Sequence, residues 1–334
     1  MSYDNLKLEK GLYTCAGGFT KALESIDPSE NYVGTSLENL DAYQRQLKRF
    51  DIKVSGFGSD SVEKFFKTSD SAALFPEYVN RSVYQGMVEN DVLGKMVATV
   101  TNIESMDYRS IASIPTEDEK SLKIVNEGDF IPETNIRVRE NLVSLHKRGR
   151  MLVASYEAIK LQRLDLFSVT LKQIGAYIAK ARTSDAISVL LSGDGNTNPA
   201  TAVSQSGSAF AYADLLSLWS KFSDYNLTTL VASPTTLTKI LALSEMRDAY
   251  TGLDFHSTGK LVTPFGAQIL KSTGVADGTV LAFDNTCTLQ QVQVGEVQTE
   301  FDKLIDRQLE RAVISSITGF AKIYDDSCYS MSIS

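Results

Sequence analysis

The sequence is poor in the residues that most often carry out catalysis or cross-link a chain. Its 334 residues include only two histidines, three cysteines and one tryptophan. Cys15, Cys287 and Cys328 lie far apart and match no C-x-x-C spacing, so we expect reduced thiols that serve packing in a cytoplasm-like compartment. His146 and His256 have no partner at metal-ligand spacing, and neither is expected to act in catalysis.

The motifs of common nucleotide-binding and hydrolytic sites are also missing. The chain contains no G-x-x-x-x-G-K, no G-x-G-x-x-G that opens a helix and no G-x-S-x-G. The segment 194–198 is similar to the start of a calcium loop, but Pro199 stands where that loop needs glycine and Gln205 where it needs a bidentate glutamate. We therefore predict no catalytic residue, no cofactor and no metal ion.

Charge and hydropathy exclude two further classes of protein. The net charge is -8 at pH 7, whereas a protein that grips DNA needs a surplus of Lys and Arg to displace counterions. No apolar run reaches the length of about 18 residues that a membrane helix needs, and residues 1–10 are too polar for a signal peptide. An apolar content of 43% with 22% charged residues is typical of a folded domain.

The segment from Ser155 to Gly195 predicts one long helix. Apolar side chains recur along it at steps of three and four residues, at Leu164, Phe167, Leu171, Ile174, Ile178 and Ala181. Asp165 is a candidate N-cap and Gly193 a candidate C-cap, which predicts a helix over 166–191. At about 1.5 Å per residue this helix would be roughly 39 Å long. Its single apolar face must pack against another element, and we expect a β-sheet.

The chain before this helix predicts two segments without cores of their own. Residues 1–75 are expected to form an arm, in which one helical stripe is made by Leu40, Tyr43, Leu47 and Phe50. Residues 95–154 change to strand periodicity around a charged tip at 117–120, which predicts a long β-hairpin. Because a two-stranded ribbon is marginal alone in water, we expect arm and hairpin to pack against other copies of the protein.

After Gly195 the pattern alternates between helices and strands. The expected helices are 212–222 and 234–243, and the expected strands are 227–232, 268–271, 278–283 and 289–294. This alternation predicts a compact α/β domain that ends near Val297. Two extended runs, 304–317 and 320–333, are separated by Gly319, and we expect them to form an antiparallel pair that covers the long helix.

This order of parts resembles the major capsid protein of tailed bacteriophages, a fold shared with the herpesvirus capsid floor and encapsulin shells. The residues that carry the resemblance are Phe75-Pro76-Glu77, Glu127-Gly128 with Ile131-Pro132, Val153-Ala154-Ser155-Tyr156-Glu157, and Asp165-Leu166 leading to Gly193-Asp194-Gly195. The resemblance covers about residues 70–334. It implies an α+β fold with an N-terminal arm (1–75), an extended β-hairpin loop with its base strands (95–154) and an α/β axial domain (201–300). The remaining segments would form a peripheral domain, which comprises 76–94, the spine helix in 155–200 and returning antiparallel strands in 301–334.

The resemblance implies a structural protein and no enzyme. Copies would form pentamers and hexamers and close into an icosahedral head shell around double-stranded DNA, which they would enclose without sequence-specific binding. Portal, scaffolding and decoration proteins are the other implied partners, no membrane is involved, and the virion, assembled in the bacterial host cytoplasm, is the implied location. The candidate inter-subunit contacts are Glu117, Asp118, Glu119, Lys120 and Lys123 near the hairpin tip and Leu40, Tyr43 and Leu47 in the arm.

Several alternatives stay open at this point. An encapsulin-type nanocompartment shell has the same fold, and a soluble α/β hydrolase is a remote possibility that a pocket around His146 or His256 would support. A phage tail or decoration component is disfavoured by the long helix. Some relatives join subunits by isopeptide bonds, but no partner asparagine or catalytic glutamate matches Lys120 or Lys123, so we predict no cross-link. Because the chain begins at Met1, we expect no removal of an N-terminal scaffold.

Overall fold

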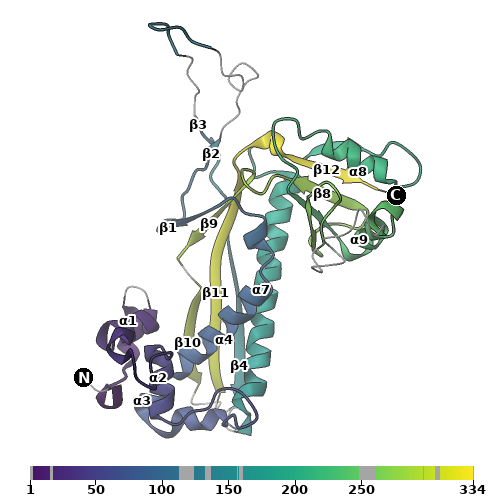
Figure 1. The fold of residues 1–334 in the computed structure, drawn as a ribbon. Coiled ribbons are helices and arrows are strands. Elements are labelled where there is room, and N and C mark those ends of the chain that lie inside the picture. Colours follow the sequence, from purple (N-terminus) through teal and green to yellow (C-terminus); the bar gives the residue numbers. More distant parts are fainter. Residues whose placement is uncertain are drawn as a thin grey trace. The chain divides into compact units, whose positions relative to one another are not determined.

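The structure is a computed structural model that describes residues 3–15, 18–112, 124–131, 137–155, 157, 161–247, 261–295, 297–304 and 309–333 (Figure 1). The chain divides into two compact units. Unit 1 comprises Met1–Asn90, Gly149–Ile178 and Val297–Ser315, and unit 2 comprises Asp91–Arg148, Ala179–Glu296 and Ser316–Ser334. Three elements have residues in both units, namely β4 (Leu145–Ser155), α7 (Leu164–Ser192) and β11 (Leu309–Lys322).

The N-terminal part of unit 1 is built from short helices. They are η1 (Tyr3–Asn5), η2 (Lys10–Thr14), α1 (Gly18–Ile26), η3 (Ser29–Tyr32), α2 (Ala42–Arg49), η4 (Val62–Lys67), α3 (Ser69–Ala72) and α4 (Phe75–Glu89). A capping box starts α2, because the Asp41 carboxylate accepts from the Gln44 amide while the Gln44 side chain accepts from the Asp41 amide. Pro76 lies in the first turn of α4, where its missing N–H costs no helical hydrogen bond.

These short helices share a core with α4 and the first half of α7. The buried side chains of this core come from the whole N-terminal segment and include Leu8, Phe19, Leu23, Tyr43, Leu47, Phe65, Phe75, Tyr78, Phe167 and Leu171. The described residues of 1–75 therefore pack against α4 and α7 of their own chain, and the expectation that other copies of the protein supply this packing is wrong. Each helix has too narrow an apolar stripe to be stable alone, but the stripes together enclose one core.

The long helix is confirmed, because α7 spans 29 residues and buries the face that begins at Leu164. Its ends differ in detail from the prediction. Asp165 lies inside the first turn, where its carboxylate accepts from the Leu166 amide at 2.8 Å, so it is not the N-cap. Gly193 directly follows the helix with φ +91°, a left-handed conformation that glycine adopts without strain.

Helices α4 and α7 cross in unit 1 with their backbones in contact. A Cβ atom added to Gly86 would lie well inside 3.0 Å of the Lys172 carbonyl oxygen, and one added to Gly175 equally close to the Val83 carbonyl oxygen. Both obstacles are main-chain atoms in helices, so no side chain can move aside to make room. The two glycines thus set the distance between the helices.

Gly175→Ala is expected to destabilise the protein although alanine favours helices. The gain in helix propensity is about 1 kcal/mol, whereas forcing two packed helix backbones apart costs roughly 1–3 kcal/mol and disturbs the neighbouring core contacts. Gly58→Ala is the control, because a Cβ there would meet nothing within 4 Å and φ is not positive. Thermal unfolding should show a lower midpoint for Gly175→Ala alone, and equal midpoints would contradict the crossing geometry.

A long sheet contains β1 (Thr99–Ile103), β9 (Leu289–Val294), β11 and β10 (Gln298–Leu304) in that order, with β4 also paired to β11. In unit 1, β10 runs antiparallel to β11 from Gln298 opposite Ser315 to Leu304 opposite Leu309. In unit 2, β9 runs antiparallel to β11 from Thr318 opposite Gln293 to Lys322 opposite Leu289, and β1 pairs parallel with β9. The strand at 289–294, expected in the α/β domain, therefore belongs to this sheet.

The returning strands differ from the prediction. Gly319 was expected to separate two paired runs, but it lies within β11. Among the described residues of the two runs, none of 320–333 pairs with 304–317. A Cβ at Gly319 would lie 2.6 Å from the Ser144 carbonyl oxygen, so this glycine permits a close backbone approach and marks no turn. The last strand, β12 (Cys328–Ser332), joins the second sheet.

The second sheet lies in unit 2 with the order β5-β12-β8-β6-β7. Its other strands are β5 (Thr201–Ser204), β6 (Thr229–Ala232), β7 (Gln268–Lys271) and β8 (Thr279–Phe283), and its helices are α8 (Tyr212–Trp219), α9 (Pro234–Leu241) and α10 (Ser244–Arg247). Leu230 and Ala232 face α8 and α9, whereas Val231 faces Ile187 and Leu190 of α7. The predicted α/β character of this region is confirmed.

Candidate assembly surfaces

A hairpin in unit 2 carries several large apolar side chains that the chain itself leaves exposed. Its strands β2 (Ile111–Ala112) and β3 (Arg137–Val138) pair antiparallel, and the residues described between them are 124–131. Within that stretch Asn126 to Asp129 form a turn, in which the Asp129 amide donates to the Asn126 carbonyl at 3.1 Å. Gly128 has φ +87°, as the third residue of such a turn often requires. The turn therefore displays Glu127 to solvent.

Apolar side chains flank this turn and are almost fully exposed. Ile124 is 99% exposed, Phe130 79% and Ile131 73%. Ile111 and Val138 on the two paired strands are also exposed. Exposing large apolar side chains to water costs free energy. For this reason an exposed group of such side chains usually marks a site that binds another molecule.

The base of the hairpin is held by a buried arginine. Arg139 makes two hydrogen bonds to the Asp325 carboxylate, at 3.0 and 2.5 Å, and one to the Lys322 carbonyl at 3.2 Å. Asp325 begins η7 (Asp325–Ser327) and also accepts from the Asn198 side chain at 2.8 Å. A bidentate arginine–carboxylate pair fixes orientation as well as distance, so Arg139, which directly follows β3, is held firmly against η7.

The loop that follows α7 completes this anchor. The Asp194 carboxylate accepts from the Lys322 amide at 3.0 Å, and the Asn141 side chain donates to the Gly195 carbonyl at 2.7 Å. Thr197 has φ +60°, which is rare for a β-branched residue. From the sequence this loop could be identified only as the end of a helix. The residues that form hydrogen bonds with it, Lys322 and Asn141, are far away along the chain.

Lys322 is buried beside this anchor. Its Nζ donates to the Asn198 carbonyl at 2.7 Å, and its side chain is fully covered. Burial lowers the pKa of Lys322 below its ordinary value of 10.5, because the charged ammonium loses its hydration. Between the lowered pKa and 10.5 the unfolded chain therefore binds more protons than the folded chain, and this group makes stability rise with pH across that window.

Lys322→Met is expected to remove this rise. Methionine has a similar length and does not titrate, so the wild-type unfolding free energy minus that of the variant should increase toward pH 10.5. The increase should be about 1.4 kcal/mol for each unit by which the pKa is lowered. Denaturant unfolding of both proteins at several pH values from 7 upward (roughly one unit apart) measures the difference. A pH-independent difference would show that Lys322 titrates normally.

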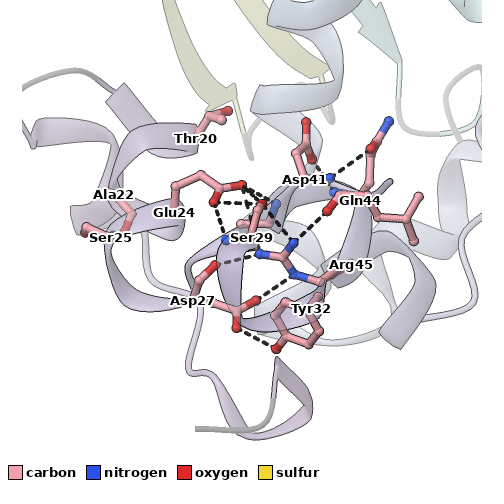
Figure 2. Close-up of polar contacts among 12 residues, drawn as sticks. Thr20, Ala22, Glu24, Ser25, Asp27, Ser29, Tyr32, Asp41, Gln44 and Arg45 are labelled. Carbon is pink, nitrogen blue, oxygen red and sulfur yellow. Dashed lines mark hydrogen bonds and ion pairs between the residues drawn. The ribbon is translucent and has the colours of Figure 1, made fainter. Parts of the chain in front are cut away.

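A second buried polar cluster joins α1, η3 and α2 in unit 1 (Figure 2). Arg45 donates from Nε to the Asp27 carboxylate at 2.8 Å and from a terminal nitrogen to the Asp27 carbonyl at 2.6 Å. Its other terminal nitrogen donates to Ser29 Oγ and to the Leu40 carbonyl. The Tyr32 hydroxyl donates to Asp27 at 2.6 Å, and the guanidinium carbon lies 4.3 Å from the Tyr32 ring centroid. These groups satisfy one another, so the cluster stabilises the fold.

The residues predicted as inter-subunit contacts are placed as follows. Glu117, Asp118, Glu119, Lys120 and Lys123 lie outside the described residues. Tyr43 and Leu47 pack inside the core of unit 1, and the half-buried Leu40 gives its carbonyl to Arg45. Tyr43 and Leu47 are therefore covered by their own chain and are not surface contacts, whereas Leu40 remains a proposed contact. The exposed residues 124–131 were not predicted as contacts, although a run of apolar residues around Glu-Gly-Asp was visible in the sequence.

The geometry gives no support to a hydrolase around His146. This side chain is exposed on β4, with Nε2 3.3 Å from Ser144 Oγ, and an exposed ring lacks the buried carboxylate that orients a catalytic base. His256 lies outside the described residues. Among the residues that the structure does describe, no three His, Cys, Asp or Glu side chains are grouped to hold a metal ion. In the same residues, no helix is both long and apolar enough to cross a membrane.

The three cysteines are free thiols with different surroundings. Cys328 is buried and Cys287 half-buried, and burial raises the pKa of each thiol to about 11. Both therefore stay protonated and weakly reactive near neutral pH. Cys15 is exposed, so the expected packing role does not apply to it.

Comparison with known proteins identifies relatives of this architecture. A family model described as "Phage capsid protein" matches residues 139–316, more than half of the 334-residue chain. The chain is similar to a virus-like particle from Pyrococcus furiosus, with a TM-score of 0.54 and 17% identity over 76% of this chain and 98% of that one. It is also similar to the capsid of an empty GTA particle, with a TM-score of 0.54 and 14% identity over 73% and 90% of the two chains.

A third similar structure comes from Microbacterium phage Oxtober96, with a TM-score of 0.53 and 9% identity over 73% of this chain and 91% of that one. At such identities, structural likeness shows the fold alone. No curated protein matches the chain significantly.

Proposed function

The chain belongs to the phage capsid protein family and is thus a major structural protein of a capsid, and we propose that its copies form pentamers and hexamers that close into an icosahedral phage head. The exposed apolar hairpin is the observation that carries this proposal. Ile124, Phe130 and Ile131 are left in water by their own chain, and a neighbouring copy would cover them. One similar structure is the capsid of an empty GTA particle, which supports assembly of copies of this fold into a shell.

A ring requires that each subunit present two different surfaces, one that inserts and one that receives. The hairpin suits the inserting role, because it is anchored rigidly at its base by Arg139 and Asp325. On this interpretation, 95–154 acts as the extended loop, 76–94 with 155–200 and 301–334 forms a peripheral domain around α7, and 201–300 forms an axial domain. Residues 1–75 then act as an N-terminal extension that is folded into unit 1.

We propose double-stranded DNA as the content of the shell. A net charge of -8 would prevent tight binding of the phosphate backbone, so DNA could be enclosed without sequence-specific contacts. Portal, scaffolding and decoration proteins are proposed as further partners, and assembly in the bacterial host cytoplasm precedes incorporation into the virion. An encapsulin-type compartment shares the fold, but the family match favours the phage capsid.

Sedimentation velocity of the purified chain tests self-assembly. The expected result is a fast-sedimenting species whose amount increases with protein concentration, while a slower subunit species stays in equilibrium with it. Assembly that buries apolar surface should also be favoured by sulfate, which strengthens the hydrophobic effect. A single monomeric species at every concentration, with and without sulfate, would contradict the proposal.

A further inference from the structure

We propose that the peptide bond between Asp27 and Pro28 is a conditional cleavage site. The packing of Arg45 and Tyr32 around Asp27 protects this bond in the folded chain, and the bond breaks in acid when the N-terminal helices of unit 1 come apart. The inference goes beyond the proposed function and does not depend on it, because a single unassembled subunit carries every residue involved.

The chain contains only one bond of this kind. Of its seven prolines, Pro28 alone follows an aspartate. An aspartate carboxylate can attack its own main-chain carbonyl carbon and close a small cyclic anhydride. Proline favours this route in acid, because its tertiary nitrogen is a good leaving group once protonated and has no N–H for a competing ring closure. The bond after Asp27 is therefore the peptide bond of this chain that acid cleaves most readily.

The cleavage would proceed in two steps. A carboxylate oxygen of Asp27 forms a bond to the Asp27 carbonyl carbon, the bond from that carbon to the Pro28 nitrogen breaks, and the nitrogen leaves with a proton taken from the acidic solvent. Water then opens the anhydride left on Asp27. The products are residues 1–27, which end in a free carboxyl group, and residues 28–334, which begin with a secondary amine. Their masses add up to that of the intact chain plus one water.

In the folded chain every polar group of Asp27 is engaged (Figure 2). Its amide donates to the Leu23 carbonyl at 2.8 Å, and its carbonyl accepts from Arg45 at 2.6 Å. One carboxylate oxygen accepts from Arg45 Nε at 2.8 Å and the other from the Tyr32 hydroxyl at 2.6 Å. Both oxygens that could act as the nucleophile are thus hydrogen-bonded, and rotating the carboxylate toward its own carbonyl carbon would break both bonds.

Burial also keeps water from the reacting group. The side chain of Arg45 is fully covered and that of Asp27 is 2% exposed. The hydrogen bond from Arg45 to the Asp27 carbonyl would by itself polarise the carbonyl carbon and favour attack. The same guanidinium holds the carboxylate, however, and the anhydride yields products only when water reaches it. The folded cluster therefore keeps the bond intact.

The charges around Asp27 come from each of the elements packed on it. Arg45 belongs to α2, Tyr32 to η3 and Glu24 to α1, and a Glu24 carboxylate oxygen lies 3.9 Å from a terminal nitrogen of Arg45. Acid that protonates the two carboxyl groups removes the negative partners of a fully buried guanidinium, and an unpaired buried charge favours opening of the cluster. The condition that opens the cluster is thus the one that supplies the proton for cleavage.

Cleavage would make the opening irreversible. Residues 1–27 contain α1 and the two short helices before it, which place Leu8, Phe19 and Leu23 in the core of unit 1. Once cut, this segment is a separate molecule and no longer benefits from the high effective concentration that the chain provides. The cut chain would therefore be a lasting record that its N-terminal helices have come apart.

Acid incubation followed by mass spectrometry tests the site. The buffer is the most acidic one in which the wild type keeps its circular dichroism spectrum, used with and without urea. In urea the wild type should yield residues 1–27 and 28–334. Without urea, cleavage should be at least about a hundredfold slower, because only the small opened fraction of the chain reacts. Pro28→Ala should give neither fragment under either condition.

Two variants test whether the cluster itself gives the protection. Without urea, Arg45→Met should be cleaved at least about tenfold faster than the wild type, because the buried carboxylate has lost its cation. Tyr32→Phe, which removes one hydroxyl and keeps the ring, should be cleaved faster by a smaller factor. Arg49→Met is the matched control, since Arg49 lies one turn further along α2 and donates to the Leu6 carbonyl instead. Its cleavage rate should stay near that of the wild type.

Several results would overturn the proposal. They are an unfolded chain that is not cut after Asp27, equal rates for the folded and the unfolded wild type, and an acceleration by Arg49→Met as large as that by Arg45→Met. If Arg45→Met does not fold, Tyr32→Phe takes its place, and an unchanged rate for that variant contradicts the protection. Sedimentation measures shell assembly separately, so each of these results leaves the proposed function standing.

Discussion

Ile174→Asp is expected to leave no folded protein. Ile174 is buried in the middle of α7 and belongs to the core that joins the N-terminal helices to this helix. A carboxylate there would either lose its hydration without a partner or force the core open to water. Either outcome costs several kcal/mol, which is comparable to the entire stability of about 5–15 kcal/mol of a typical domain. The protein should appear in the insoluble fraction or lack a cooperative thermal transition.

Val169→Asp is the matched control for this experiment. Val169 lies on the same helix with its side chain 62% exposed, so the introduced carboxylate remains hydrated. This variant should be soluble and unfold cooperatively within about 1 kcal/mol of the wild type. A soluble, cooperatively folded Ile174→Asp protein would mean that the buried face of α7 is assigned wrongly.

Arg45→Met is expected to lower the unfolding free energy by about 3–5 kcal/mol, because it leaves the buried Asp27 carboxylate without its cation. Arg45 is fully buried and Asp27 almost so, which means that water cannot replace the lost ion pair. The substitution also leaves the Asp27 and Leu40 carbonyls without donors. Chemical denaturation of the subunit measures the loss.

The double variant Arg45→Met/Asp27→Leu separates the charge from the packing. With both charged groups replaced by apolar ones, most of the loss should be recovered, since no unpaired charge remains buried. A single Arg45→Met variant as stable as the wild type would contradict the burial of the pair. If the double variant is no more stable than Arg45→Met, the loss of stability comes from the carbonyls that Arg45 hydrogen-bonds and not from the unpaired charge.

The sequence predicted those parts of the fold that follow from local periodicity. The three- and four-residue spacing of Leu164 to Ile178 lies within one helix, and the strands at 229–232, 268–271 and 279–283 show short apolar runs between turn residues. The N-terminal segment was predicted wrongly because its core exists only when several short stripes meet. Gly319 was taken as a turn residue, but its role depends on a carbonyl far away in the sequence.

The candidate assembly surfaces could be predicted only in part. The pairing of β2 with β3 agrees with the hairpin predicted from strand periodicity, and the expectation that this hairpin packs against a neighbouring copy stays a prediction. The anchor at its base was not predicted, because Arg139 and Asp325 are 186 residues apart and no local pattern links them. The pair of Arg45 and Asp27 was likewise invisible, since charged residues on short helices are usually exposed.

Electron microscopy of the purified protein, vitrified at a concentration at which fast-sedimenting material is present, tests the central claim most directly. The account predicts closed shells of uniform size whose walls contain rings of five and six copies, with density from residues 124–131 of each copy lying against its neighbour. Dispersed monomers, or particles in which this hairpin segment touches no other copy, would contradict it.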